Sequence, residues 1–173
     1  LNFHGSGWRL PWELAQLSAA SATLTLRADD GVWLYAASQV FTLDGNGLTV
    51  DVSVSNEGDD AMPFGIGLHP WFPRHGDGMI QFAAAGMWSS TSEGETVALE
   101  PVAPVMDYSR AKAPPRHGLN TCFAGWPGQY RVIWPNRNVA LTVTADATMG
   151  HLMLHIPADD TDTICLEPQS NAP

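Results

Sequence analysis

Short runs in which apolar and polar residues alternate are the feature that most limits how this chain can fold. The alternation has a period of two over residues 22–28, 48–54 and 139–144. Successive side chains of a strand point to opposite faces, so this period places one face of each strand against a core. Residues 129–134 and 161–166 are two further expected strands. We therefore expect a chain built mainly of β-strands.

Turn-forming residues separate these runs. Gly, Pro, Asn and Asp are concentrated at residues 44–47, 56–60, 126–128 and 135–138. Nowhere do apolar residues follow a helical spacing over three turns, so we expect almost no helix. Strands at short spacing with such turns are typical of an antiparallel sandwich or barrel, and the pattern does not choose between them. We expect the least patterned segment, residues 91–118, to form long loops over one rim of the sheet.

The composition fits a single folded domain spanning residues 1–173. Hydrophobic residues make up 45% of the chain and charged residues 15%, which is enough apolar content for a core. The 18 acidic and 8 basic residues give a net charge of −10, which disfavours nucleic acid and anionic lipid as partners. No apolar run reaches the roughly 18 residues of a membrane span. The chain starts without Met beside a dense motif, so we expect sequence to be missing at both ends.

The cysteines and the known short motifs give no indication of a metal or a cofactor. Cys122 and Cys165 are the only cysteines and are not in a CxxC pair, so we expect two reduced thiols in or near the core and a cytoplasmic protein. His151 and His155 are four residues apart on a strand-like segment, where the helical metal spacing does not apply. The chain also lacks a nucleophile elbow, a Walker loop and a dinucleotide fingerprint.

Two ionisable residues interrupt apolar segments, where burial makes a charge costly. His69 follows a glycine-rich apolar run and precedes Pro70, which favours an extended backbone. Glu167 ends an apolar strand directly before Pro168. A partly desolvated histidine and a carboxylate can exchange protons near neutral pH, as general acid–base catalysis requires. Taken one at a time, a structural histidine and a solvent-facing glutamate are the simpler interpretations.

The 7 tryptophans can fill a core or stack on the apolar face of a sugar ring. We assign core filling to Trp33, Trp88 and Trp134. Trp71 and Trp126 remain candidates for sugar stacking.

Four segments, taken together and in order, resemble the aldose 1-epimerase family. They are residues 4–13, with His-Gly and then Pro-Trp-Glu; residues 65–72, with Gly-Leu-His-Pro-Trp-Phe; residues 119–126, reading Leu-Asn-Thr-Cys-Phe-Ala-Gly-Trp; and residues 166–173, with Leu-Glu-Pro-Gln. The resemblance covers nearly the whole chain. It implies an antiparallel β-sandwich with a shallow sugar cleft, and an enzyme that interconverts the α and β anomers of a free sugar.

The resemblance also implies roles for individual residues. Glu167 matches the general base that takes the proton of the anomeric hydroxyl, and His69 matches the general acid that protonates the ring oxygen. The expected substrate-binding residues are His4, Trp71, Asn120 and Gln169. This chemistry needs no nucleophile, metal or redox cofactor. We expect Glu167 and His69 on one face of the sheet, with room for a pyranose ring between them.

Two departures from the family pattern bear on the substrate. Asn120 stands where the family commonly has an aspartate, so a hydrogen-bonding group is kept and a negative charge is lost. The hexose-phosphate branch reads His-Gly-Phe-Ala-Arg, whereas Trp8 takes the place of that arginine here. We therefore expect a neutral sugar. A hexose-6-phosphate 1-epimerase, hinted at only by Arg9, Arg74 and Arg110, and a noncatalytic carbohydrate-binding module are the alternatives.

Overall fold

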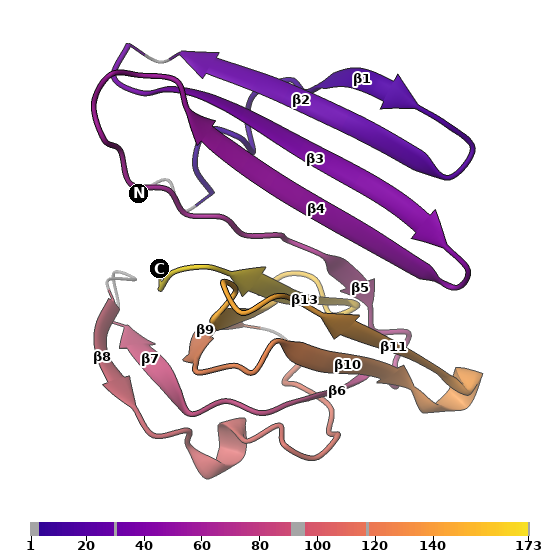
Figure 1. The fold of residues 1–173 in the computed structure, drawn as a ribbon. Coiled ribbons are helices and arrows are strands. Elements are labelled where there is room, and N and C mark those ends of the chain that lie inside the picture. Colours follow the sequence, from indigo (N-terminus) through magenta and orange to yellow (C-terminus); the bar gives the residue numbers. More distant parts are fainter. Residues whose placement is uncertain (1–3, 30, 91–95, 117, 173) are drawn as a thin grey trace. The chain divides into compact units, whose positions relative to one another are not determined.

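The computed structural model describes residues 4–29, 31–90, 96–116 and 118–172 (Figure 1). The chain divides into two compact units, Leu1–Phe64 and Gly65–Pro173, which we call unit 1 and unit 2 and describe separately. Within the described residues the only helical segments are two 3-10 turns, Pro104–Met106 and Pro135–Arg137, so the expectation of an almost purely β chain is confirmed. The expectation of a single domain stays a prediction.

Unit 1 is a four-stranded antiparallel sheet in which the strands pair in chain order. Its strands are β1 (Glu13–Leu17), β2 (Ser21–Asp29), β3 (Leu34–Asp44) and β4 (Gly47–Asn56). Asp44 pairs with Gly47 across the β3–β4 hairpin, and Gly45 has a left-handed φ of 57°. Glycine is favoured at the first of the two central positions of such a tight hairpin, because it adopts a positive φ without steric cost.

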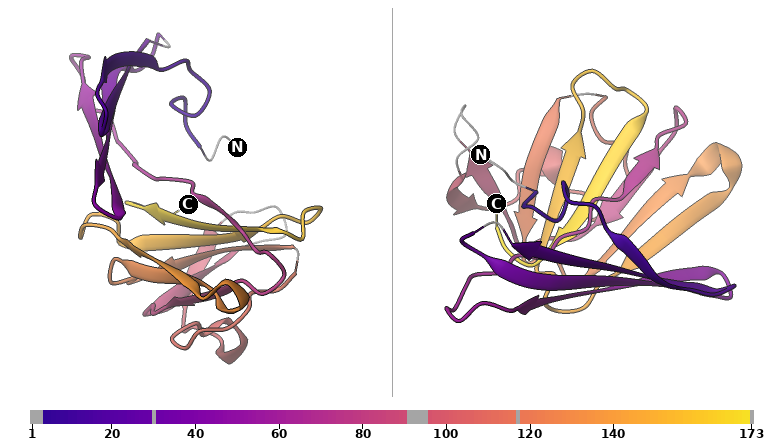
Figure 2. Two further views of the ribbon diagram at one scale, coloured as in Figure 1. Left: turned by 90° about the vertical axis from the view of Figure 1, so that its right-hand side faces the viewer. Right: turned by 90° about the horizontal axis from the view of Figure 1, so that it is seen from above.

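Unit 2 contains two antiparallel sheets (Figure 2). The six-stranded sheet has the order β5 (Trp71–Pro73), β13 (Thr163–Gln169), β12 (His151–Ile156), β9 (Leu119–Ala124), β7 (Gly86–Ser90) and β8 (Thr96–Glu100). The three-stranded sheet has the order β11 (Val139–Thr144), β10 (Gln129–Trp134) and β6 (Met79–Phe82). This arrangement agrees with the antiparallel sandwich that the resemblance implies.

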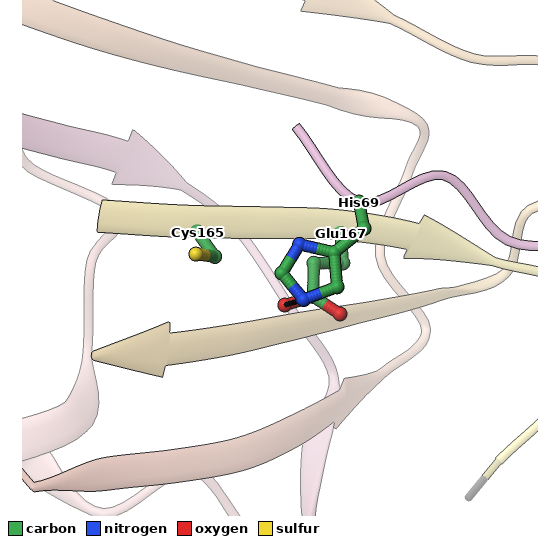
Figure 3. Close-up of side chains that lie close together, drawn as sticks. All are labelled: His69, Cys165 and Glu167. Carbon is green, nitrogen blue, oxygen red and sulfur yellow. Dashed lines mark ion pairs between the residues drawn. The ribbon is translucent and has the colours of Figure 1, made fainter. Parts of the chain in front are cut away.

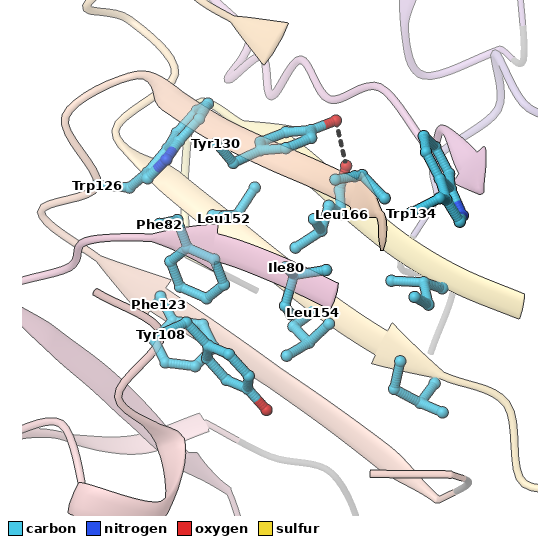
Figure 4. Packing of buried hydrophobic residues seen from close by; sticks show 13 residues of the cluster. Ile80, Phe82, Tyr108, Phe123, Trp126, Tyr130, Trp134, Leu152, Leu154 and Leu166 are labelled. Carbon is cyan, nitrogen blue, oxygen red and sulfur yellow. Dashed lines mark hydrogen bonds between the residues drawn. The ribbon is translucent and has the colours of Figure 1, made fainter. Parts of the chain in front are cut away.

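The core of unit 2 lies between its two sheets (Figure 4). Among its buried side chains are Ile80, Tyr130 and Val132 from the three-stranded sheet and Leu152, Leu154 and Leu166 from the six-stranded sheet. The hydroxyl of Tyr130 donates a 3.1 Å hydrogen bond to the carbonyl oxygen of Leu166 and so ties β10 to β13. Because side chains alternate along β12 and β13, their intervening residues occupy the opposite face of the six-stranded sheet.

The sequence located the strands with clear alternation and missed shorter ones. Residues 129–134 and 139–144 coincide with β10 and β11, whereas β13 begins at Thr163 rather than at residue 161. The expectation of loops over residues 91–118 is wrong for Thr96–Glu100, which form β8 and pair with β7, and residues 91–95 and 117 lie outside the described residues. Strand β8 joins the sheet through this pairing with the preceding strand, which the periodicity of the sequence does not reveal. No helix in the described ranges is long and apolar enough to cross a membrane.

The tryptophans only partly follow the assignments made from sequence. Trp134 is buried in the core, as expected, and donates a hydrogen bond to the carbonyl of Pro73. Trp33 is 37% exposed, so its assignment to the core is wrong. Trp126 is buried and donates its indole N–H to the carbonyl of Gln129, which excludes it as a sugar-stacking residue. Cys122 and Cys165 are free and buried, as expected.

Candidate functional site

The pairing of β5 with β13 brings His69 and Glu167 together, although they are far apart in the chain. The antiparallel register joins Trp71 to Cys165 and, four residues away, Gly67 to Gln169. His69 and Glu167 lie midway between these two pairs and therefore face each other. The backbone N–H of Leu68 donates a 3.0 Å hydrogen bond to the carbonyl of Pro168, which holds the segment before β5 against β13.

The two side chains are in direct contact (Figure 3). His69 Nε2 lies 3.1 Å from Glu167 Oε1, and the side chains are 22% and 12% exposed. Burial raises the pKa of Glu167 from 4.5 to about 7, because desolvation penalises the carboxylate. Glu167 can therefore take up and return a proton near neutral pH. The pair shares one face of the sheet as expected, but a pyranose ring does not fit between atoms 3.1 Å apart, so that expectation is wrong.

The aromatic ring of Trp71 lies beside this pair. Its ring stacks on the His69 imidazole, with centroids 5.2 Å apart and planes inclined by 18°. The side chain of Trp71 nevertheless stays 58% exposed, so it can also contact a ligand. The arrangement offers a proton donor, a proton acceptor and an apolar surface in one place, which suits a small polyhydroxyl molecule with an apolar ring face.

Comparison with known proteins identifies the family and supports the fold. The model of the family described as aldose 1-epimerase matches residues 1–172. This chain belongs to the aldose 1-epimerase family. It is 36% identical to the uncharacterized protein YphB of Escherichia coli (strain K12) over 98% of this chain, and it spans 61% of that relative's length.

Two solved structures share the fold. A crystal structure from E. coli K12, provisionally named an aldose 1-epimerase, superposes with a TM-score of 0.92 at 33% identity, over 98% of this chain and 61% of that one. A galactose mutarotase-like protein from Clostridium acetobutylicum superposes with a TM-score of 0.84 at 14% identity, over 96% of this chain and 58% of that one. The second similarity concerns the fold alone.

Asn120, an expected substrate-binding residue, connects to the pair through a histidine. Its Oδ1 lies 3.1 Å from His155 Nδ1. His155 is the register partner of both Asn120 and Cys165, and its ring is tilted by 70° to that of His69 at 6.4 Å. The sequence did not single out His155 as part of the site. Its alternation with the buried residues of β12 placed it on the polar face, but only the sheet order sets it beside His69.

Gln169 extends the same face in the other direction. Its Nε2 lies 3.4 Å from the Cys122 sulfur, and its register partner on β12 is His151. Trp88 stacks on His151 with ring centroids 6.5 Å apart and is half-buried there, so its assignment to the core is wrong. Burial lowers the pKa of His151, which favours a neutral imidazole.

Two further candidates from the sequence, His4 and Arg74, are described separately. His4 belongs to unit 1, where its ring lies 5.3 Å from that of Trp8, and we do not assign it to this face. Arg74, a possible phosphate ligand by sequence, is buried and donates hydrogen bonds of 3.0 and 2.7 Å to the carbonyls of Pro114 and Pro115. Its role is structural. Five of the six expected site residues therefore gather on one face of unit 2: His69, Trp71, Asn120, Glu167 and Gln169.

Proposed function

We propose that this chain interconverts the α and β anomers of a free hexose by acid–base opening of the sugar ring. The observation that carries the proposal is the 3.1 Å contact between His69 Nε2 and Glu167 Oε1 on a partly exposed face beside Trp71. Membership of the aldose 1-epimerase family supports the reaction class.

Ring opening needs two proton transfers at neighbouring oxygens. The Glu167 carboxylate takes the proton of the anomeric hydroxyl O1, and the protonated His69 gives a proton to the ring oxygen O5. The bond between C1 and O5 breaks as O1 becomes the aldehyde oxygen. Each positioned proton transfer contributes roughly 10²–10⁴-fold to the rate.

Closure on the other face of the aldehyde completes the reaction. The aldehyde rotates about the C1–C2 bond, neutral His69 takes the proton back from O5, and protonated Glu167 returns one to O1. Because O1 and O5 are both bonded to C1, an acid and a base that touch each other can reach both from one side. The sugar would therefore lie across the pair, with Trp71 against its apolar face, rather than between the two side chains.

A neutral sugar suits this sheet better than a sugar phosphate. The six strands of the sheet that holds the pair contain no Lys or Arg. A phosphate carries a charge of about −1.5 to −2 at neutral pH and is usually bound by such cations. Near Glu167 it would instead meet a carboxylate, so we expect glucose-like sugars to be preferred over their 6-phosphates.

Polarimetry of freshly dissolved glucose tests the proposal. We expect the protein to accelerate mutarotation and Glu167→Gln to reduce the acceleration by at least about 10²-fold, since a positioned general base contributes that much or more. Glu100→Gln is the matched control, because Glu100 is an exposed glutamate at the end of β8 in the same sheet. Normal catalysis by Glu167→Gln would refute the assignment of the base.

Two further arms separate the alternatives. Calorimetric sugar binding without any mutarotation by the wild-type protein would identify a noncatalytic carbohydrate-binding module. Faster turnover of glucose 6-phosphate than of glucose would identify a hexose-6-phosphate 1-epimerase. Binding that weakens in Trp71→Ala and survives in Glu167→Gln would agree with the proposed division between ring stacking and proton transfer.

A further inference from the structure

Cys165 lies beside the proposed catalytic pair but takes no part in the proposed reaction. It precedes Glu167 by two residues on β13, so the two side chains point to the same face of the sheet (Figure 3). One donor atom from each of His69, Cys165 and Glu167 lies within 4.8 Å of the other two. The register across β5 and β13 therefore gathers a nitrogen, a sulfur and an oxygen ligand.

We propose that His69, Cys165 and Glu167 form a site for a zinc-class divalent cation, whose binding stops the proton transfers. Imidazole, thiolate and carboxylate are the ligand types that Zn²⁺ takes in proteins, often three of them with a fourth position left open. The metal–ligand bonds of such sites are about 2.0–2.3 Å long, which sets neighbouring ligand atoms well under 4.8 Å apart. The 3.1 Å contact between His69 and Glu167 already has a suitable spacing for two ligands of one ion. The Cys165 sulfur is therefore the atom that has to move closer to the other two.

Burial raises the pKa of Cys165 to about 12, so the charges of the site match a divalent cation only once the ion has displaced the thiol proton. A Glu167 carboxylate and a Cys165 thiolate together carry two negative charges, and a neutral His69 adds none. No Lys or Arg in the strands of this sheet competes for them. On binding, the Cys165 thiol releases its proton to solvent as the metal–sulfur bond forms, because a coordinating thiol is deprotonated by the ion.

A bound cation would use the same electron pairs as catalysis. The Nε2 lone pair of His69 and the carboxylate of Glu167 would both face the metal, so neither could receive or deliver a proton. This inhibition rests on the proposed function, whereas the binding of the metal does not.

Titration of chelator-stripped protein with Cd²⁺ tests the site, because cadmium–thiolate bonds absorb in the ultraviolet. We expect the absorption band to appear in the wild-type protein and in Cys122→Ser, and to be displaced by Zn²⁺. Cys122 is the matched control, since it is the other buried thiol of the same sheet. In Cys165→Ser we expect no thiolate band and at least about 100-fold weaker Zn²⁺ binding by calorimetry, because losing even an outer partner of a ligand costs about 10–100-fold.

A second variant decides the question if Cys165→Ser does not fold. Glu167→Gln keeps the thiol, and we expect its Cd²⁺ affinity to fall by at least about tenfold. Absence of the band in the wild-type protein, an equal band in Cys165→Ser, or unchanged affinity in Glu167→Gln would overturn the three-residue site.

Mutarotation measured with and without Zn²⁺ tests the inhibition separately. Zn²⁺ should abolish mutarotation by the wild-type protein. The Cys165→Ser variant should need at least about 100-fold more Zn²⁺ for the same inhibition. Wild-type activity that persists at saturating Zn²⁺ would refute the inhibition. If the stripped wild-type protein has no activity at all, the proposed function fails, while the Cd²⁺ band still decides whether the metal site exists.

Discussion

Glu167 is the residue whose chemistry depends most on its surroundings. Its side chain is 12% exposed, and burial raises its pKa to about 7. A glutamate with this pKa is a much stronger base than one in water, yet it still loses its proton at neutral pH. Glu167 stands on β13, between β5 and β12 in the sheet. Its burial there therefore affects both the rate of the proposed reaction and the free energy of unfolding.

The raised pKa predicts how the reaction rate depends on pH. Glu167 acts as a base only when it is deprotonated, so kcat/KM should fall about tenfold for each pH unit below about 7. The measurement is polarimetry across the acid range in the presence of a chelator. A rate that stays constant down to about pH 5 would contradict a base with this pKa.

The same shift predicts how stability depends on pH. Because the folded-state pKa of Glu167 lies above the unfolded value of 4.5, its favourable contribution is complete below about 4.5 and is lost as the pH rises to about 7. The uncharged Glu167→Gln should therefore be more stable than the wild-type protein at alkaline pH, by about 3 kcal/mol, since one pKa unit corresponds to about 1.4 kcal/mol. Denaturant unfolding with a chelator at about pH 4 and pH 8 measures the difference, which should vanish at the lower pH.

At the scale of elements, the register between strands decides which side chains meet. Strand β5 has only three residues, WFP, and no recognisable alternation. Its pairing with β13 nonetheless places His69 against Glu167, and the pairing of β12 with β9 places His155 against Asn120. Turns that hold the strands in these registers therefore affect the site indirectly.

The turn before β10 provides a test at this scale. Gly128 has a left-handed φ of 81°, and a Cβ atom there would lie 2.7 Å from the carbonyl oxygen of Ala145. Gly128→Ala should destabilise the protein by more than the roughly 1–2 kcal/mol that a left-handed conformation costs an ordinary residue. Gly118→Ala is the control, because Gly118 has a φ of 73° but no atom within 4 Å of such a Cβ. Equal losses in denaturant unfolding would show that the close approach at Gly128 is unimportant.

At the scale of the whole molecule, the described residues form two β units, and the candidate pair belongs to the second. In unit 2 the face of the six-stranded sheet opposite the pair packs on the three-stranded sheet, so the same strands supply the core and the site. On β13 the core residue Leu166 directly precedes Glu167, so a substitution that disturbs the core there also disturbs the site.

Tyr130→Phe tests this coupling between core and site. The substitution removes the hydrogen bond to Leu166 and leaves a buried carbonyl without that partner, which should cost about 1–3 kcal/mol in denaturant unfolding. Because Leu166 adjoins Glu167, mutarotation should also slow, while sugar binding changes little. Full stability in Tyr130→Phe would show that the link between β10 and β13 adds nothing.

The sequence by itself determined the β class, the strands with clear alternation such as residues 129–134 and 139–144, and the family resemblance carried by four ordered segments. Each of these depends on neighbours in the chain or on short motifs. Only the tertiary structure decided the strand order, the inclusion of β8 and the positions of Trp33, Trp88 and Trp126. It also set His69 in contact with Glu167 and brought Cys165 and His155 beside them, because pairing between distant strands has no periodic trace in the sequence.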